Sequence, residues 1–422
     1  MNEIKVEYKI VPKQGERIAD ILGLLKKDIS WGTFIPRLKS AENSLKKAPV
    51  IPDYSPDRFE PTVDPKDNNI VELSFNTEMF DFEREGINHF IGTIAGDILF
   101  NNKIEEIRIN KISFTPNLYD TYFKGPKSGT NVLRENILQS TLNNTNRPIV
   151  AFTVKPRLGL NIAQYERIIS DAAKAEIDII EDDERLVDPR YCPFKQRVDA
   201  IHKLIQNGSK SKFSVNLTGN PDLLRENVEY AYQKGIRIFK LDVMVAGFDM
   251  LKKLNDIRFG FDEPTAITVF PDVYESSYRH LSRSAILELA RLCGADIIYA
   301  GSSKYSRMGV IDNPEDLETD VLRLISIHHE LSKNINNTIK PTLPTMTHDI
   351  HPSSAESLIY AMRYYKHYDY AFFIGGGIAG FDDAEKDIYD TGKFWMELVK
   401  RASSKDISGL NNFGDIGNII EN

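Results

Sequence analysis

The chain has 422 residues, enough for two domains with a large core, and its 41% hydrophobic and 27% charged residues are typical of a globular protein. Its net charge of −8, without a basic cluster interleaved with aromatic residues, argues against nucleic acid as the main partner. No stretch approaches the ~18 apolar residues of a membrane span, the N-terminus lacks a signal-peptide core, and Cys192 and Cys293 are the only cysteines. We therefore expect a cytoplasmic protein with no membrane contact, disulfide framework or structural zinc site.

The first part of the chain mixes strand and helix patterns. Alternating apolar residues predict three half-buried strands, and helical apolar spacing predicts two helices: strands over 1–12, 70–75 and 104–114, helices over 15–27 and 87–100. A β-α-β order of this kind, repeated around an antiparallel sheet, is typical of an α+β sandwich of the ferredoxin-like type. We place this N-terminal domain at residues 1–145.

From Arg147 the pattern becomes regular and stays so to about residue 402. Eight apolar, β-rich runs predict strands over 148–154, 177–180, 213–215, 238–241, 266–270, 297–299, 342–343 and 370–374. Each run is followed by a helix-period segment, over 162–175, 194–206, 223–234, 248–254, 283–292, 314–331, 355–365 and 384–402. Eight strands alternating with eight helices over ~250 residues predict a (β/α)8 barrel at 146–402, with a tail at 403–422.

The strand predicted at 177–180 ends in four consecutive carboxylates, Glu181-Asp182-Asp183-Glu184. Like charges this close raise each other's pKa unless a counter-charge is present. A hard divalent cation such as Mg²⁺ is the economical counter-charge, because it takes oxygen ligands. The alternative is a solvated acidic turn, which most charge runs are. The position at the end of a barrel strand favours the metal.

Polar residues also follow the other predicted strands, and the active sites of such barrels lie at the C-terminal ends of the strands. In chain order these residues are Lys155 and Arg157, Asn216, Asp242, Asp272, Ser302 to Lys304, Thr347, His348, Asp349 and His351, and Gly375, Gly376 and Gly377.

Three of these features have two interpretations each. Lys155 follows a buried strand and could be a general base or charge stabiliser, or else a surface lysine. The glycine triplet could bind a phosphate through its backbone N–H groups, or simply form a tight strand-to-helix turn. His348 and His351 could be acid–base groups or hydrogen-bonded loop histidines.

Several blocks of the sequence stand in an order that is specific in combination. They are Gly92 to Asp97, Phe123-Lys124-Gly125-Pro126 with Gly129, Thr153-Val154-Lys155-Pro156-Arg157-Leu158-Gly159-Leu160 followed by Glu181 to Glu184, and Phe373 to Gly377. In these blocks the chain resembles the large subunit of RuBisCO, from about residue 5 to about residue 400. The resemblance implies an N-terminal α+β domain, a C-terminal barrel, bound Mg²⁺ and a head-to-tail homodimer in which one subunit completes the active site of the other.

The chain departs from the family at the metal site. The family holds its ion with a carbamylated lysine and with the Asp and Glu two and three residues later. Here Glu181 stands at the lysine position, while Asp183 and Glu184 are retained. We therefore expect Mg²⁺ on Glu181, Asp183 and Glu184, with no lysine carbamate.

Other carboxylase features are missing. Lys304 is displaced by about two positions from the lysine that stabilises the carboxylated intermediate. The phosphate-binding His-Arg pair is replaced by Pro271-Asp272, the histidine near the sixth strand by Tyr299, and the Ser-Gly-Gly near the seventh strand by Thr347-His348-Asp349. An aspartate in place of cations repels a second phosphate, so a bisphosphate substrate is not expected.

The enolising features are kept. Lys155 stands at the position of the enolising base, and Asn216, Asp242 and the glycine triplet persist. Asp28 stands where the family has a glutamate from the partner subunit, Gly32 and Thr33 stand where the family contacts the phosphate, and Asp97 replaces an asparagine. The chain therefore resembles a RuBisCO-like protein of the form IV type rather than a true carboxylase.

The expected function is Mg²⁺-dependent enolisation, isomerisation or decarboxylation of a phosphorylated keto-sugar through a metal-bound enediolate, as an enolase, isomerase or lyase. The expected catalytic residues are Lys155, Arg157, Asp28, Asp97, Asn216, Asp242 and His348. The expected substrate-binding residues are Thr33, Lys304, Thr347, Gly375, Gly376 and Gly377. Two alternatives stay open: a carboxylase with a glutamate-based metal site, and a non-catalytic scaffold that kept the fold.

Overall fold

A computed structural model of the protein describes residues 3–22, 25, 62–63, 67, 69–96, 101–142, 145–271, 280–301, 314–335, 338–347, 350–379, 387–408 and 413. The chain divides into two compact units, Met1–Phe123 with Val273–Leu289, and Lys124–Asp272 with Ala290–Asn422. The domain bounds 1–145, 146–402 and 403–422 stay a proposal. None of the helices in the described ranges is long and apolar enough to cross a membrane.

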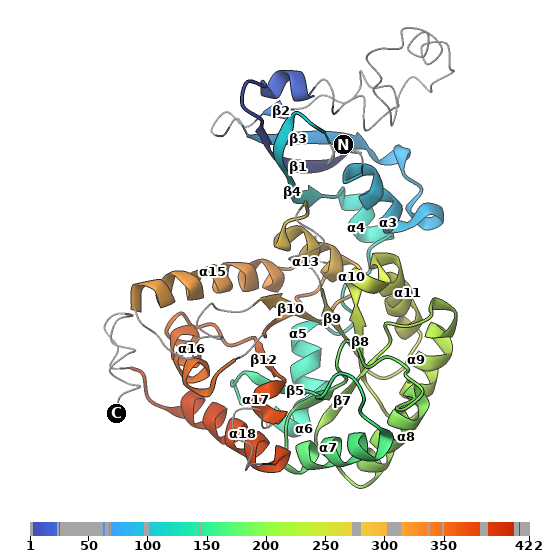
Figure 1. The fold of residues 1–422 in the computed structure, drawn as a ribbon, viewed down its shortest axis with the longest axis vertical. Helices are drawn as coiled ribbons and strands as arrows, with labels where there is room; N and C mark the ends of the chain where they lie inside the picture. The colour runs from blue at the N-terminus through green and yellow to red at the C-terminus, as the bar shows by residue number, and fades with distance from the viewer. Residues whose placement is uncertain are drawn as a thin grey trace. The chain divides into compact units, whose positions relative to one another are not determined.

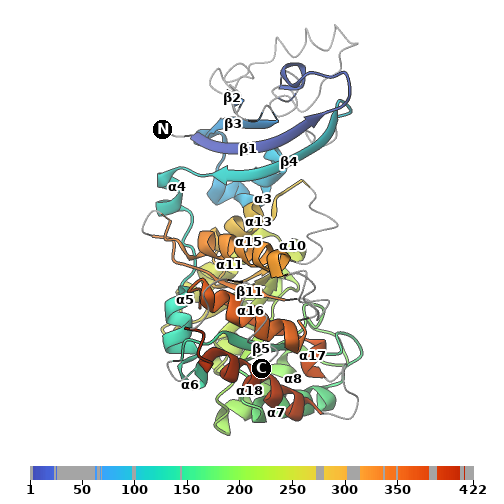
Figure 2. The ribbon, with the colours of Figure 1, turned by 90° about the vertical axis from the view of Figure 1, so that its left-hand side faces the viewer.

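The first unit contains a four-stranded antiparallel sheet in the order β2-β3-β1-β4. Its strands are β1 (Glu3–Pro12), β2 (Thr62–Val63), β3 (Ile70–Asn76) and β4 (Ile104–Ser113). Figure 2 shows β1 and β4 curving side by side, in agreement with their antiparallel pairing. Every second residue of β1 is buried, from Ile4 to Ile10, so one face of the sheet packs on a core. The predicted α+β domain is confirmed.

The helices of this unit are α3 (Phe82–Ile94) and α4 (Pro116–Thr121), with a 3-10 turn η3 (Thr77–Met79). Helix α3 begins earlier than the predicted residue 87. The Asp81 side chain caps it by accepting from the Arg84 N–H at 3.2 Å, and Gly86 separates this first turn from the rest. Of the helix predicted over 15–27, residues 18–22 and 25 are helical.

The second unit is built on a closed barrel of eight parallel strands. The strands are β5 (Ile149–Thr153), β6 (Ile179–Glu181), β7 (Lys212–Asn216), β8 (Ile238–Asp242), β9 (Ala266–Phe270), β10 (Ile297–Gly301), β11 (Leu343–Met346) and β12 (Ala371–Ile374). All residues of β5, β8, β9 and β10 are buried, as expected for parallel strands covered on both faces.

One long helix follows each strand in the chain, and in Figure 1 the helices that lie wholly within this unit surround the strands of the barrel. In chain order the long helices are α7 (Ile162–Lys174), α8 (Phe194–Gln206), α9 (Leu224–Gln233), α11 (Phe248–Phe259), α13 (Arg283–Leu292), α15 (Pro314–Ser332), α16 (Pro352–Tyr364) and α18 (Ile388–Ser404). Shorter elements are α5 (Gly129–Val132), a π-helical turn η5 (Leu133–Ile137), α6 (Gln139–Leu142), η6 (Pro221–Leu223), α10 (Val243–Ala246) and α17 (Gly376–Ala379). The predicted (β/α)8 barrel is confirmed.

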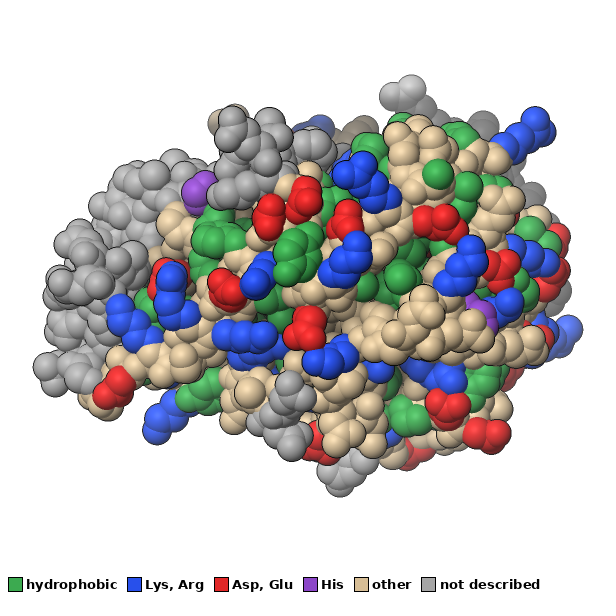
Figure 3. Space-filling model, turned by 90° about the horizontal axis from the view of Figure 1, so that it is seen from below, with side chains coloured by type: hydrophobic (Ala, Val, Ile, Leu, Met, Phe, Trp, Pro, Cys, Tyr) green, Lys and Arg blue, Asp and Glu red, His purple; other side chains and the backbone are tan. Residues whose placement is uncertain are grey.

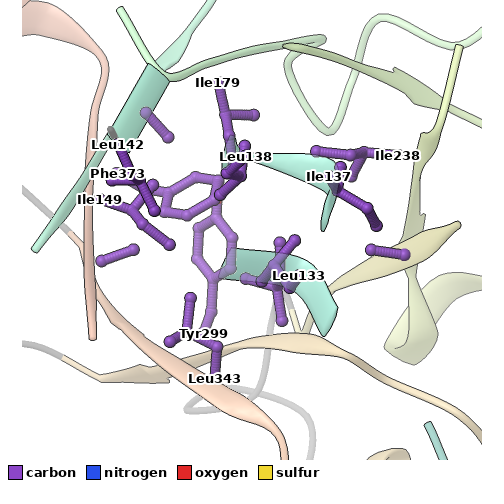
Figure 4. Packing of buried hydrophobic residues seen from close by; sticks show 14 of the residues in the cluster. Leu133, Ile137, Leu138, Leu142, Ile149, Ile179, Ile238, Tyr299, Leu343 and Phe373 are labelled. Atoms are coloured by element: carbon purple, nitrogen blue, oxygen red, sulfur yellow. The ribbon is translucent and has the colours of Figure 1, made fainter. Parts of the chain in front are cut away.

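The N-terminal end of the barrel is apolar. The first residues of most strands point inward there, and the segment 129–142 packs against them (Figure 4): Leu133, Ile137, Leu138 and Leu142 meet Ile149, Ile179, Ile238, Ala266, Ile297, Leu343 and Ala371. A buried ion pair fixes each of two strands at this end, Arg147 with Asp178 at 2.6 Å and Arg258 with Asp296 at 2.5 Å. Apolar side chains therefore fill the inside of the barrel at this end.

The outer surface carries charges of both signs. On the face seen in Figure 3, Lys and Arg side chains alternate with Asp and Glu, and no broad region of that face is purely basic.

Candidate active site

The C-terminal ends of β5, β6, β7 and β8, which are neighbours in the barrel, bring several predicted residues together. They are Lys155, Arg157, Glu181, Asp183, Glu184, Asn216 and Asp242. Other predicted residues lie outside the described ranges, namely Asp28, Thr33, Asp97, Asp272, Lys304, His348 and Asp349. The geometry below therefore concerns only the described residues at this end of the barrel.

The acidic run is divided between two sides of β6. Asp182 faces the helices, where its carboxylate accepts hydrogen bonds from Tyr165 of α7 at 2.8 Å and from Arg197 of α8 at 3.2 Å. Asp182 and Arg197 are completely buried, and Arg197 also donates to the carbonyl groups of Cys192 and Val187 at 2.5 and 2.6 Å. Asp182 thus ties the strand to its covering helices.

Glu181 faces the barrel interior and is held by three donors. Its Oε1 accepts from Lys240 Nζ at 2.6 Å, from Thr153 Oγ1 at 3.1 Å and from the Tyr299 hydroxyl. Its other oxygen, Oε2, is buried and has no hydrogen-bond partner in the described part of the chain. A solvated acidic turn is therefore not what forms at this position.

Lys240 was not among the residues predicted for the site. Its side chain is completely buried and its Nζ also donates to the Asp182 carbonyl at 3.0 Å, while Glu184 Oε2 lies 3.8 Å away. The rings of Phe270 and Tyr299 each lie 5.5 Å from Nζ, measured to the ring centroid.

Burial by itself lowers the pKa of Lys240, but attraction from Glu181 and Glu184 outweighs it, and the pKa lies above its usual value. A lysine in the middle of a fully buried strand is the sequence signal that could have found this residue. Ile238, Lys240 and Asp242 alternate along β8, so they point to the same side of the strand.

Lys155 lies just past β5 and contacts Asp183. The lysine ammonium donates to Asp183 Oδ2, and Asp183 Oδ1 accepts from the Arg185 backbone N–H at 2.9 Å. A Cβ added to Gly375 would lie 2.8 Å from Lys155 Cε. The first glycine of the triplet therefore makes room for the Lys155 side chain.

The two remaining carboxylates also face cations. Glu184 lies 3.3 Å from Arg157; burial raises its pKa, but Lys240, Lys155 and Arg157 together hold it below the usual value. Asp242 lies 3.7 Å from Arg185, and burial raises the pKa of this carboxyl to about 6.

Asn216 positions the acidic loop. Its side-chain amide donates to the carbonyl groups of Asp183 and Glu184 at 3.1 and 2.9 Å. Its side-chain oxygen accepts from the Thr218 N–H at 3.0 Å, so the amide is held at both ends. The loop that carries two of the predicted metal ligands is therefore fixed by a neutral side chain.

The predicted phosphate residues are placed as follows. Gly376 and Gly377 begin the short helix α17, in which Ala379 N–H bonds to the Gly375 carbonyl at 3.0 Å. Thr347 is buried just past β11. His351 is exposed at the start of α16, with its Nδ1 3.1 Å from Ser353 Oγ. The tight turn from β12 into α17 is enough to explain the glycine triplet, and phosphate binding by these glycines stays a prediction.

The three predicted metal ligands fit a divalent ion poorly in this arrangement. Both oxygens of Asp183 are engaged, and Glu184 and Glu181 Oε1 face cations. In the described part of the chain, no three His, Cys, Asp or Glu side chains form a group that could hold a metal ion. The unpartnered Glu181 Oε2 would supply one ligand, whereas Mg²⁺ requires near-octahedral oxygen coordination. The magnesium expected from the sequence stays a prediction, and nothing below is routed through it.

A closed (β/α)8 barrel with charged side chains gathered at the C-terminal strand ends is the arrangement of barrel enzymes. Residues 136–387 match the family of the ribulose bisphosphate carboxylase large chain, catalytic domain, and residues 1–118 match its N-terminal domain. The chain belongs to the RuBisCO large-chain family.

Its relatives are distant. The chain is 23% identical to ribulose bisphosphate carboxylase of Archaeoglobus fulgidus, covering 90% of this chain and 85% of the relative. For that of Pyrococcus furiosus the identity is again 23%, with 96% and 92% covered.

Among solved structures, octameric Rubisco from Pyrococcus horikoshii gives a TM-score of 0.75 at 19% identity, covering 100% of this chain and 91% of that one. Dimeric archaeal Rubisco from Hyperthermus butylicus gives 0.74 at 21% identity, covering 95% and 90%. These structures share the fold of this chain.

Proposed function

We propose that the protein is a RuBisCO-like enzyme that moves a proton at the carbon next to the carbonyl group of a phosphorylated keto-sugar. The contact between Lys155 and Asp183 carries the proposal. It holds an amine against a completely buried carboxylate, while the lysine side chain keeps 18% of its surface exposed to a substrate. Membership of the RuBisCO family supports the choice of substrate class.

Lys155 would transfer the proton. The Lys155 ammonium first releases a proton to solvent, and the amine so formed takes the proton from the carbon, while the C–H electron pair moves into the enediolate. Asp183 stabilises the ammonium ion that forms, because its Oδ2 accepts the lysine hydrogen bond. Return of the proton to the same carbon gives exchange, and return to the neighbouring carbon gives isomerisation. If the carbon carries a carboxylate instead of the proton, release of CO₂ leaves the C–C electron pair in the same enediolate, which gives decarboxylation.

Arg157 would face the anionic parts of the substrate. Its side chain is 54% exposed and lies 3.3 Å from Glu184, so the guanidinium is reachable from solvent. We assign Thr347, Gly375, Gly376 and Gly377 to a single phosphate, with Lys304 and Thr33 beyond the described residues. We also propose a homodimer with shared active sites, since one related archaeal Rubisco is described as dimeric.

The test is hydrogen exchange in D₂O, followed by proton NMR, against a panel of phosphorylated and unphosphorylated ketoses that includes ribulose bisphosphate. We expect exchange next to the carbonyl of a monophosphate, lost in Lys155→Met. Lys174→Met is the matched control, because Lys174 is an exposed lysine on α7 that pairs with Asp171. Equal exchange in Lys155→Met and the wild-type protein would overturn the assignment of the base.

The carboxylase alternative has specific support, because the relatives quoted above are called ribulose bisphosphate carboxylase. Exchange with the bisphosphate, together with fixation of labelled CO₂, would establish that function for this chain. No exchange with any ketose of the panel would favour a scaffold that kept the fold.

A further inference from the structure

We propose that the Lys240 ammonium takes the place of a divalent cation in the active site, so that the charges of this site are complete without a metal ion. The inference deepens the proposed function, on which it rests for the location of the site. Its test measures ion binding and therefore does not depend on turnover.

The first argument is the balance of charge. We call the charge cluster the eight residues Lys155, Arg157, Glu181, Asp183, Glu184, Arg185, Lys240 and Asp242. Each carboxylate in it has its own cation: Glu181 has Lys240, Asp183 has Lys155, Glu184 has Arg157, and Asp242 has Arg185. The cluster is therefore neutral, and a divalent ion added to it would create an excess of two positive charges.

The second argument is the position of the ammonium. Lys240 Nζ lies 2.6 Å from Glu181 Oε1 and 3.8 Å from Glu184 Oε2, so it stands between two of the three carboxylates predicted to share an ion. An ion bridging the same two oxygens would have to displace the ammonium or lie directly against it. Like charges in a buried site repel strongly because the local dielectric is low.

The third argument is that the Lys240 side chain has no alternative position. Its carbonyl acceptor on Asp182 lies at 3.0 Å, and the rings of Phe270 and Tyr299 flank it. The side chain is completely buried, so it cannot turn to solvent when an ion arrives. The lysine is therefore held in the cation position by the barrel itself.

The fourth argument is the identity of residue 181. Where the resemblance implies a carbamylated lysine, a carboxylate made from CO₂, this chain has Glu181, a permanent carboxylate. Three neutral or cationic donors already bind Glu181 Oε1, from Thr153, Lys240 and Tyr299. The protein thus supplies both the anion and its counter-charge from its own side chains.

The experiment is a titration with Mn²⁺, in which the electron paramagnetic resonance signal of the free ion reports binding. Wild-type protein, Glu181→Gln and Lys240→Met are compared. We expect identical Mn²⁺ binding in wild-type protein and Glu181→Gln, because the cluster takes no ion in either. Lys240→Met leaves the four carboxylates of the charge cluster with three cations, and we expect it to bind one additional equivalent of Mn²⁺ and to gain thermal stability from it.

Two results would overturn the proposal. One is an equivalent of Mn²⁺ on the wild-type protein that is lost in Glu181→Gln, which would place a metal at the cluster. The other is no additional equivalent in Lys240→Met, which would mean that the vacated position accepts no ion. If Lys240→Met fails to fold, the wild-type and Glu181→Gln comparison still decides. Binding of a metal ion to the wild-type protein would not contradict the proposed proton transfer. Absence of deuterium exchange, in turn, would not change what the Mn²⁺ titration shows.

Discussion

Glu181 and Asp182 are neighbours in the chain, yet the barrel gives them different roles. Successive side chains of a strand point to opposite faces, so Asp182 meets Arg197 among the helices and Glu181 meets Lys240 inside the barrel. Both pairs are completely buried. Arg197 is saturated by Asp182 and by backbone carbonyl groups, whereas the inner pair adjoins the partly exposed Lys155 and Arg157. Surroundings, and not residue type, distinguish the carboxylate among the helices from the one inside the barrel.

The largest expected effect is a loss of stability on breaking the pair that lies among the helices, Asp182 and Arg197. Arg197→Met leaves Asp182 buried without its cation, and we expect the free energy of unfolding to fall by about 3–5 kcal/mol. Denaturant unfolding followed by circular dichroism measures it.

The control for this variant is Arg225→Met, which removes an arginine from the exposed i,i+4 pair with Glu229 and should cost less than about 0.5 kcal/mol. A loss below about 1 kcal/mol in Arg197→Met would mean that Asp182 is not a structural anchor.

The next largest effect concerns the charged side chains at the C-terminal end of the barrel. Gly375→Ala places a Cβ 2.8 Å from Lys155 Cε, so the lysine stem must shift away from its present position. Displacement of a reacting group by about 1 Å costs roughly 100-fold in rate, and we expect a loss of that order in the deuterium exchange rate. Stability should change little, because the lysine is flexible and partly exposed.

Gly260→Ala serves as the comparison for Gly375→Ala, because a Cβ there would make only an ordinary contact of 3.4 Å with the Ile257 carbonyl. Its exchange rate should match that of the wild-type protein. An unchanged rate in Gly375→Ala would show that the room beside Lys155 is not needed for proton transfer.

The smallest effect concerns pH. Burial raises the pKa of Asp242 from 3.8 to about 6, so the folded protein binds a proton more tightly here than the unfolded chain does. Stability therefore falls as the pH rises from about 4 to about 6, where the unfolded chain ionises first. Asp242→Asn removes this loss and keeps the side-chain oxygen that caps α10.

Unfolding free energies at pH 4 and pH 7 measure this difference between the two proteins. The wild-type protein should lose about 1–3 kcal/mol relative to Asp242→Asn over that interval. A constant difference would mean that Arg185, 3.7 Å away, keeps the carboxylate ionised throughout.

Local patterns predicted most of the fold. The helix over 194–206 and the strand over 266–270 have the predicted bounds, because helix periodicity and short apolar runs are properties of neighbouring residues. The ends that differ depend on local detail. Helix α16 begins at Pro352 rather than at residue 355, and α11 continues to Phe259 rather than ending at residue 254. Proline is well tolerated in the first turn of a helix, which explains the earlier start of α16.

By itself, the sequence determined the alternation of strands and helices, the family blocks and the position of the acidic run at a strand end. Only the tertiary structure decided which counter-charge each carboxylate meets. Glu181 and Lys240 are 59 residues apart and meet because β6 and β8 belong to one closed barrel. Gly375 reaches Lys155 because β12 pairs with β5. Electrostatic partners depend on distances across the barrel, and such distances exist only once the barrel has closed.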